Sequence, residues 1–344
     1  MKRCLQLAAM GTGRVAPNPM VGAVLVFADR IIGEGYHQVF GAAHAEVNCI
    51  NSVMEADRHL VPRSTMYVSL EPCSHYGKTP PCADLIIENR IPDVVIGCQD
   101  SFAVVNGKGI ERLRAAGITV TVGVLEKECI DLNKPFFTFH QRHRPYIILK
   151  WAQSSDGMIG ATGTGRVFIS NGYTNRLVHK WRSEAAAILI GTNTALLDDP
   201  SLTTRLWPGK HPLRLVIDKT LQLPVHLKLF DGSTKTIVFN CIKQSGSGNL
   251  VYHLLDKEEN ILAQVLAALY TMQVQSVLVE GGSRLLQAFI DEGLWDEARV
   301  IINQQLTIGN GISAPVLKDH LQVNELIVKT DSISFFKNER NIKI

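Results

Sequence analysis

The sequence predicts an α/β protein built from two domains, and three observations lead to this prediction. The chain has 344 residues, which is longer than a single hydrophobic core usually serves. Its composition, 46% hydrophobic and 19% charged, is typical of a globular protein and excludes a disordered or fibrous chain. Apolar patterns of strand and helix period alternate along both halves of the chain. Such alternation favours layers of helices on a mostly parallel sheet.

The first 140 residues are expected to form a three-layer α/β domain. Val21–Phe27 and Ile31–Ile32 flank a short polar turn and predict a hairpin. From residue 45 onward, segments of helical period alternate with short apolar runs typical of buried strands. The expected helices are 45–54, 82–89 and 109–116, and the expected strands are 66–70, 93–98 and 118–122.

A domain boundary is expected next to Pro145. The segment Phe136–Pro145 follows a helical pattern and ends in a proline, which disfavours helix in the residue before it. We therefore assign one domain to residues 1–144 and a second to residues 145–344.

The second half repeats the alternation and predicts another α/β domain. Its expected helices are 174–182, 261–272 and 283–292. Its expected strands are 146–152, 187–191, 213–218, 236–240 and 276–280, with further strands near 298–302 and 326–328.

Charge and hydropathy argue against several classes of protein. The net charge is +3, from 35 basic and 32 acidic residues, and this argues against a dedicated binder of nucleic acid or of membrane surfaces. No run of 18 apolar residues is present, and Gly11 and Gly13 interrupt the first apolar stretch too early for a signal peptide. We therefore expect a cytoplasmic protein.

The cysteines are concentrated in the first half. Six of the seven precede residue 130, and an odd number without an export signal argues against a disulfide framework. Cys4, Cys49, Cys98 and Cys129 lie within apolar patterns and are expected to be buried core residues.

Two of the remaining cysteines, together with a histidine and a glutamate, suggest a metal site. His44 and Glu46 open one expected helix, and Cys73 and Cys82, each preceded by proline, flank the start of another. One His, two Cys and a nearby Glu are what a zinc deaminase requires. Three such ligands leave one open position on Zn²⁺, where the pKa of bound water falls to about 7. Glu46 would carry protons to the ring and to the leaving ammonia, so we expect one Zn²⁺ per chain held by His44, Cys73 and Cys82 alone.

Three motifs resemble one known family. Residues 17–22 read Pro-Asn-Pro-Met-Val-Gly, residues 44–46 read His-Ala-Glu, and eight residues separate Cys73 from Cys82 in the segment 71–82. Together they closely resemble the bifunctional bacterial deaminase/reductase of riboflavin biosynthesis. The resemblance implies a cytidine-deaminase-like first domain that removes the 2-amino group of 2,5-diamino-6-(5-phosphoribosylamino)pyrimidin-4-one. It also implies that Asn18, His75 and Lys78 contact this substrate.

One segment departs from that family. The chain has Asp100-Ser101-Phe102-Ala103 where the family often has Asp-Pro-Asn-Pro. A phenylalanine can stack or pack but cannot hydrogen-bond a polar ring through its side chain. No role is therefore assigned to Phe102.

The second half has no Gly-x-Gly-x-x-Gly motif after its first expected strand. Gly281 and Gly282 instead lie between an expected strand and helix, where free backbone N–H groups can bind a phosphate. Together with the segments 150–157 and 197–205, this feature resembles the family's reductase domain. The resemblance implies a dihydrofolate-reductase-like fold that uses NADPH to reduce the ribosyl group to ribityl.

The resemblance also implies residue roles in the second half. Asp198 is implied as a catalytic carboxylate near the cofactor, whereas Arg166 stands where many members carry serine and is given no role. The implied substrate contacts are Arg182, Leu202, Arg205 and Glu280. The implied cofactor contacts are Ala152, Phe168, Thr194, Asp198, Gly282, Ser283, Arg284, Leu285, Leu286, Gln287 and Ala288.

Two alternative functions share the zinc motif. A nucleic-acid base or nucleoside deaminase with an accessory α/β domain would use the same chemistry, but holding a flipped base requires a basic, aromatic surface. A purely structural zinc requires a fourth protein ligand, which neither motif offers. We expect a small pyrimidine ribotide as the substrate, no nucleic-acid or membrane partner, and a homodimer or larger homo-oligomer.

Overall fold

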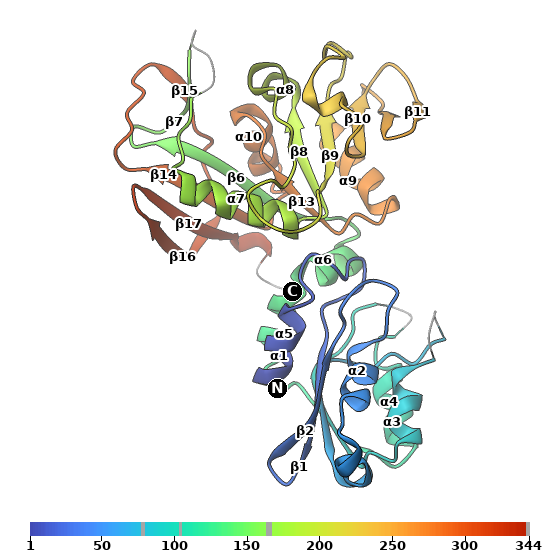
Figure 1. The fold of residues 1–344 in the computed structure, drawn as a ribbon. Coiled ribbons are helices and arrows are strands. Elements are labelled where there is room, and N and C mark those ends of the chain that lie inside the picture. Colours follow the sequence, from blue (N-terminus) through green and yellow to red (C-terminus); the bar gives the residue numbers. More distant parts are fainter. Residues whose placement is uncertain (77–79, 103–104, 163–166, 342–344) are drawn as a thin grey trace. The chain divides into compact units, whose positions relative to one another are not determined.

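The computed structural model describes residues 1–344 apart from 77–79, 103–104, 163–166 and 342–344 (Figure 1). The chain divides into two compact units, Met1–Arg144 and Pro145–Ile344. Lys78 and Arg166, which the sequence analysis named, lie outside the described residues. Within the described parts of the chain, no helix has the length and apolar character needed to cross a membrane.

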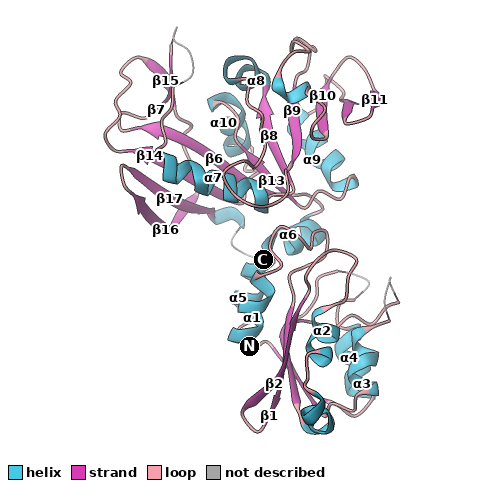
Figure 2. Ribbon diagram, viewed as in Figure 1, coloured by secondary structure: helices cyan, strands magenta, loops and turns pink. Residues whose placement is uncertain are grey.

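The first unit is a five-stranded sheet covered by helices on both faces. Its strand order is β2-β1-β3-β4-β5. Figure 2 shows α2, α3 and α4 along one face and α1 and α5 along the other. The strands are β1 (Gly22–Phe27), β2 (Arg30–Tyr36), β3 (Thr65–Leu70), β4 (Asp93–Cys98) and β5 (Thr119–Val122). The helices are α1 (Lys2–Ala9), α2 (Ala45–Asn51), α3 (Cys82–Glu88), α4 (Lys108–Ala115), α5 (Glu126–Leu132) and α6 (Lys134–Arg142), with a 3₁₀ segment at Glu55–Arg63.

This sheet is mixed, whereas the sequence predicted a mostly parallel one. β1 pairs antiparallel with both β2 and β3, while β3, β4 and β5 are parallel to one another. The carboxyl ends of parallel β3 and β4 lie at the same edge of the sheet, so the loops that follow residues 70 and 98 begin side by side. The core between the sheet and α2, α3 and α4 is apolar and includes fully buried Leu25, Met66, Ile86 and Ile96.

The second unit is a ten-stranded sheet in the order β11-β12-β10-β9-β8-β13-β6-β14-β17-β16, with a separate pair, β7 and β15. The strands from β12 to β14 are parallel, and β11, β17 and β16 are antiparallel to their neighbours. Its strands are β6 (Tyr146–Ser154), β7 (Met158–Ala161), β8 (Ala187–Gly191), β9 (Leu213–Ile217), β10 (Thr236–Asn240), β11 (Ser245–Ser247), β12 (Leu250–Leu254), β13 (Ser276–Val279), β14 (Glu297–Asn303), β15 (Gly311–Ser313), β16 (His320–Val328) and β17 (Asp331–Asn338). Its helices are α7 (Gly172–Glu184), α8 (Thr192–Asp198), α9 (Ile261–Thr271) and α10 (Ser283–Asp291), with short 3₁₀ turns at Lys228–Phe230 and Glu339–Asn341.

Alternate residues of the central strands pack on opposite faces of this sheet. Ile147 and Leu149 of β6 pack in the cluster that contains α9 and α10 residues, whereas Tyr146 and Ile148 pack with Val178 of α7. The period of two along a strand explains this division, because successive side chains point to opposite faces. Both faces are covered, which is why these strands read as continuous apolar runs.

The segment before the expected boundary at Pro145 is mostly helical, because α6 spans Lys134–Arg142. Pro135 is compatible with the first turn of a helix, where its missing N–H leaves no bond unmade. Phe136, Phe137 and Phe139 are buried and hold the helix in place. The helix ends at His143, which is left-handed (φ +52°), two residues before Pro145.

Candidate functional site

The first site lies at the edge of the sheet where β3 and β4 end. His44 caps the N-terminus of α2, Cys73 follows β3, and Cys82 is the first residue of α3. Their ligand atoms all lie within 4.8 Å of one another, and the His44 Nδ1 is 3.5 Å from Cys73 Sγ and 3.3 Å from Cys82 Sγ. Tetrahedral zinc with its usual bond lengths requires ligand atoms roughly 3.5 Å apart, so these three residues fit a zinc ion.

Hydrogen bonds prepare Cys73 to be a thiolate. The Cys82 thiol donates a hydrogen bond to Cys73, and this bond, together with His44, lowers the pKa of Cys73. The bond to Cys73 and burial both raise the pKa of Cys82. The Cys82 backbone N–H also donates to Cys73 Sγ at 3.3 Å. Metal ligands of this kind bind as thiolates, so this arrangement favours metal binding.

Glu46 lies in the first turn of α2, two residues after His44, and is buried. Burial, reinforced by nearby Cys73, raises its pKa to about 7. A carboxyl with a pKa near the working pH can both accept and release a proton. Among the described residues, the metal-binding cluster comprises His44, Cys73 and Cys82, without Glu46.

Asn18 is joined to this site through His37, a buried residue that no sequence motif indicated. The His37 Nδ1 is 3.1 Å from the Ala43 carbonyl, and its Nε2 is 3.1 Å from the Asn18 Nδ2. A carbonyl only accepts, so Nδ1 carries the proton and Nε2 accepts from the Asn18 amide. Burial lowers the pKa of His37 and so favours this neutral form. The His37 ring also lies edge-on to His44, with ring centres 5.5 Å apart.

His75 is exposed, and the structure brings it near Phe102. Their ring centres are 6.4 Å apart, and Phe102 also contacts His140 of α6 at 4.8 Å. Phe102 therefore packs between two imidazoles. Nothing in the sequence pattern near residue 102 could indicate contact with a helix that begins 32 residues later.

Glu280, at the carboxyl end of β13, is the centre of the implied substrate site in the second unit. The Arg182 guanidinium donates two hydrogen bonds to it, at 2.9 and 2.7 Å, and Lys150 Nζ lies 3.7 Å away. Burial opposes ionisation of Glu280, but Arg182 and Lys150 outweigh it and lower its pKa to about 2. The three groups therefore form a buried, ionised cluster with one net positive charge.

Thr203 connects Arg182, the partner of Glu280, to the other implied substrate residues, Leu202 and Arg205. The Arg182 Nη1 is 3.5 Å from the Thr203 carbonyl, and Arg205 Nη1 donates to Thr203 Oγ1 at 2.9 Å. The Arg205 backbone N–H donates to His179 Nδ1 at 3.0 Å. Leu202 is buried. Arg205 also lines an open cavity of about 580 Å³, together with Gly172, Arg176, Leu206, Trp207 and Pro208.

The implied cofactor residues follow two neighbouring strands. β8 and β13 are parallel and adjacent, so α8 and α10, which follow them, start at the same edge of the sheet. A Cβ on Gly282, the N-cap of α10, would come within 3.1 Å of Thr194 Oγ1 on α8, which shows how closely the two segments approach. Carboxyl ends of parallel strands and a nine-residue helix N-terminus are where dinucleotide phosphates bind.

Not all implied cofactor residues present their side chains in the same way. Phe168 is exposed and Asp198 is the last residue of α8. The Leu286 side chain is fully buried in the core, and the Gln287 side chain bonds Asp291 and Val316. Leu286 therefore has only its backbone to offer a ligand.

Both halves of the chain match known protein families. Residues 145–337 match the RibD C-terminal domain, and residues 1–98 match the cytidine and deoxycytidylate deaminase zinc-binding region. The chain is 38% identical to the riboflavin biosynthesis protein RibD of Aquifex aeolicus, over 98% of this chain and 97% of that protein. It is 36% identical to RibD of Escherichia coli, over 89% of this chain and 87% of that protein.

Solved structures show the same similarity. A diaminohydroxyphosphoribosylaminopyrimidine deaminase/5-amino-6-(5-phosphoribosylamino)uracil reductase from Thermotoga maritima matches with a TM-score of 0.90 and 35% identity. The match covers 98% of this chain and 97% of that one. RibD of Acinetobacter baumannii matches with a TM-score of 0.87 and 28% identity over the same shares of the two chains.

Proposed function

The chain belongs to the RibD family of bifunctional deaminase/reductases of riboflavin biosynthesis, and from this premise we propose how its residues divide the two reactions. Residues 1–144 would carry the zinc-dependent deamination of 2,5-diamino-6-(5-phosphoribosylamino)pyrimidin-4-one. Residues 145–344 would carry the NADPH-dependent reduction of the ribosyl group to ribityl. The observation that carries the proposal is the placement of His44, Cys73 and Cys82 around one point, beside a buried Glu46.

The deamination is proposed to depend on Glu46 as the proton carrier. Zinc held by His44, Cys73 and Cys82 supplies an activated water when bound. Glu46 would carry two protons in turn: the first from the water to the ring nitrogen, and the second from the oxygen that has added to the ring carbon to the amine, which leaves as ammonia. The carbon–nitrogen bond to the amine breaks as the carbonyl oxygen forms, so the reaction consumes one water and no reductant.

Asn18 is proposed to orient the pyrimidine. Because its amide nitrogen donates to His37, its amide oxygen is the atom that remains to accept from a substrate amine. His75 and Lys78, from the long segment between the two cysteines, are proposed as further substrate contacts on the strength of the family resemblance. The Asn18–His37–Ala43 chain supports the role of Asn18 because it leads directly to the residue before His44.

The reduction is proposed to occur between the ends of β8 and β13. NADPH would supply the hydride, and the start of α10 with Thr194 of α8 would hold it; the close approach of Gly282 to Thr194 supports this assignment. Its remaining proposed contacts are Ala152, Phe168, Asp198 and residues 283–288. Arg182, Glu280, Leu202 and Arg205 would hold the pyrimidine ribotide, and Asp198 would be the catalytic carboxylate, as the family resemblance implies. The cluster of Arg182 and Lys150 on ionised Glu280 supports a site for an anionic, polar substrate.

Separate assays of the two reactions test this proposal. The protein is incubated with the diaminopyrimidine ribotide and NADPH, and ammonia release is followed apart from NADPH absorbance. We expect Glu46→Gln to keep one zinc per chain but to lower ammonia release by about 100-fold or more, because the proton carrier is lost. The reductase rate on deaminated substrate should stay at the wild-type value. Loss of zinc from Glu46→Gln would make Glu46 a ligand and refute its assigned role.

We also propose that the protein forms a homodimer or larger homo-oligomer. β16 is an edge strand of the ten-stranded sheet, and it exposes Leu321, Val323, Leu326 and Ile327. An exposed apolar edge strand favours association with another chain. Light scattering of the purified protein distinguishes this from a monomer. The cytoplasmic location expected from the sequence stays a prediction.

A further inference from the structure

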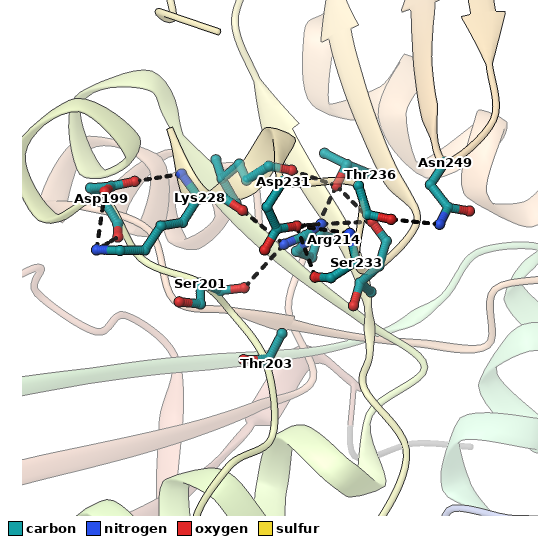
Figure 3. Close-up of polar contacts among 12 residues, drawn as sticks. Asp199, Ser201, Thr203, Arg214, Lys228, Asp231, Ser233, Thr236 and Asn249 are labelled. Carbon is teal, nitrogen blue, oxygen red and sulfur yellow. Dashed lines mark hydrogen bonds and ion pairs between the residues drawn. The ribbon is translucent and has the colours of Figure 1, made fainter. Parts of the chain in front are cut away.

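A completely buried guanidinium, that of Arg214, lies next to residues 199–205, the segment that contains the implied substrate residues Leu202 and Arg205. Arg214 of β9 has no solvent-exposed surface, and Figure 3 shows its side chain surrounded by polar groups. A buried cation is tolerated only when its N–H groups all find acceptors. The guanidinium donates to Thr236 Oγ1 (3.0 Å), the Lys228 carbonyl (3.0 Å), Asp231 Oδ1 (2.8 Å) and the Thr234 carbonyl (2.7 Å), and lies 3.5 Å from the Ser201 carbonyl.

Lys228 extends this network to Asp199. Its carbonyl accepts from Arg214, its backbone N–H donates to Asp199 Oδ1 at 2.8 Å, and its Nζ lies 3.0 Å from Asp199 Oδ2 (Figure 3). Asp199 directly follows the last residue of α8. The buried arginine therefore meets the segment 199–205 at two places: at Asp199 through Lys228, and directly at the Ser201 carbonyl.

The segment 199–205 requires such support because its backbone is strained. Asp199 (φ +38°) and Leu202 (φ +53°) are both left-handed, a conformation that is costly for a residue with a side chain, most of all for a bulky one. Such residues keep this conformation only where their surroundings impose it. Leu202 is fixed by burial in the cluster with Val216 and Leu229, and Asp199 is fixed by Lys228.

The far end of the same segment reaches the proposed substrate site. Thr203 meets Arg182, and the Arg205 backbone meets His179. We propose that Arg214 is a positioning residue for the reductase reaction: through Lys228 and Asp199 it holds the segment 199–205 so that Leu202 and Arg205 meet the pyrimidine ribotide. This inference rests on the proposed placement of the substrate at Leu202 and Arg205.

The cofactor residues before this segment have their own anchor. The Thr192 side chain at the start of α8 donates to the Ile217 carbonyl at 2.7 Å, and Ala195 is buried. Loosening the segment 199–205 should therefore change the KM for the pyrimidine ribotide and leave the KM for NADPH nearly unchanged. General unfolding of the unit would instead lower the amount of active enzyme and leave both KM values as they were.

Asp199→Gly in the full-length enzyme tests the proposal. Glycine adopts a positive φ without strain, so this change removes the carboxylate and leaves the backbone conformation allowed. We expect the reductase KM for the deaminated ribotide to rise about five- to tenfold, as for the loss of one hydrogen bond. The KM for NADPH and the deaminase activity of the same chain should stay within about twofold. Asp199→Asn should restore the KM, because its amide oxygen can accept from Lys228 and asparagine tolerates the left-handed region.

A matched control and a second variant complete the experiment. Asp319→Gly changes another left-handed aspartate that pairs with a cation, Arg340, and should leave the kinetics of both reactions unchanged. Arg214→Lys keeps the charge but not the planar fork, and it should raise the pyrimidine KM at least as much as Asp199→Gly. If Arg214→Lys fails to fold, Asp199→Gly alone decides the question.

The outcomes separate this inference from the proposed function. An unchanged pyrimidine KM in Asp199→Gly, or an equal rise in both KM values, overturns the positioning role. If Arg205→Ala raises the pyrimidine KM but Asp199→Gly does not, only the positioning role fails. If Arg205→Ala leaves that KM unchanged, the proposed substrate site fails first, and the positioning role fails with it.

Discussion

Arg205 is exposed, lines the cavity beside Trp207, and bonds within its own segment through Thr203. Arg182 is mostly buried and donates two hydrogen bonds to Glu280. Because Arg205 is exposed and lines the cavity, we expect it to bind the ribotide phosphate, for which a planar guanidinium is well suited.

Arg205→Ala should raise the reductase KM for the ribotide between about 10- and 100-fold, because one charge-assisted hydrogen bond is lost. Arg205→Lys should recover only part of this loss, since an ammonium cannot form the paired contact. Steady-state kinetics of both reactions provide the measurement. Lys210→Ala, an exposed cation of the same loop, serves as the control and should change nothing. An equal loss in the deaminase reaction would contradict the placement of Arg205.

His179 should make the stability of the second unit depend on pH. Burial and nearby Arg182 and Arg205 lower its pKa to about 4, from an ordinary value of 6.5. Between pH 6.5 and 4 the unfolded chain binds a proton that the folded unit does not, so the free energy of unfolding falls as the pH falls through this window. Below it both states are protonated and the contribution is constant.

His179→Asn removes this titration and keeps an acceptor for the Arg205 N–H. The free energy of unfolding is measured with denaturant at several pH values. Its slope against pH between 6.5 and 4 should be smaller in the variant than in the wild-type protein, by the equivalent of up to about one bound proton. His226→Asn, at an exposed histidine, is the control. Equal slopes for wild type and His179→Asn would show that His179 does not contribute.

At the residue level, the sequence was most informative where the chemistry is local. His44 and Glu46 lie in one turn of α2, and the proline–cysteine pairs mark the ends of one loop, so the three ligands could be predicted without knowing the fold. His37, Phe102 and Arg214 could not. Their importance depends on burial or on partners distant in the sequence, such as Asn18 for His37, His140 for Phe102 and Asp231 for Arg214. A single His, Phe or Arg carries no signal of either.

Among the elements that carry no zinc ligand, α4 packs against residues 71–73, the segment after β3 that ends in Cys73 and that we call the zinc loop. Glu71, which directly precedes Pro72 and Cys73, accepts the backbone N–H groups of Gly107 and Gly109 at 2.9 Å each. A Cβ on Gly109 would lie 2.0 Å from the Pro72 carbonyl, so the helix can approach the loop only because residue 109 is glycine.

Gly109→Ala should push α4 and the zinc loop apart. We expect the free energy of unfolding of the first unit to fall by about 1–3 kcal/mol, the usual cost of overpacking, together with reduced zinc retention and deaminase activity. Reductase activity should not change. Gly160→Ala, where a new Cβ would meet no atom within 4 Å, is the matched control. Full zinc content and wild-type stability in Gly109→Ala would contradict this account.

The elements that the sequence predicted are those with a strong period. The hairpin of β1 and β2, and the buried strands β3, β4, β8, β9, β10 and β13, lie close to their expected ranges. α8 was missed because its apolar residues, Ala195, Leu196 and Leu197, are consecutive and show no helical period. α6 was missed because its three phenylalanines favour strands by intrinsic propensity. β17 was missed because its alternation, with Ser332 and Ser334 buried, does not separate polar from apolar residues.

For the whole molecule, the two-domain α/β fold and the family inferred from three motifs are confirmed by the comparisons. The match between motif and family succeeds because catalytic residues tolerate little change in spacing. The hairpin of β1 and β2 was predicted, but the antiparallel pairing of β1 with β3 could not be, since strand patterns do not reveal which other strand lies beside the hairpin.

The two units should function separately. Each has its own sheet and its own apolar core, so a fragment of residues 145–344 should fold and reduce the deaminated ribotide without zinc. In the full-length protein a chelator should stop ammonia release and leave NADPH oxidation on deaminated substrate unchanged. Circular dichroism and the two assays provide the measurements. An insoluble fragment, or a reductase that stops with zinc removal, would refute this separation.

The strand order of the second unit has a consequence for synthesis on the ribosome. β6, its first strand, lies between β13 and β14, which are more than 120 residues further along the chain. The nascent chain must therefore hold an apolar strand without its neighbours until most of the unit has emerged, whereas the first unit pairs its strands in nearly sequential order. We therefore expect the second unit to expose unpaired apolar strands for longer during synthesis than the first, and to be the unit more prone to aggregation at that stage.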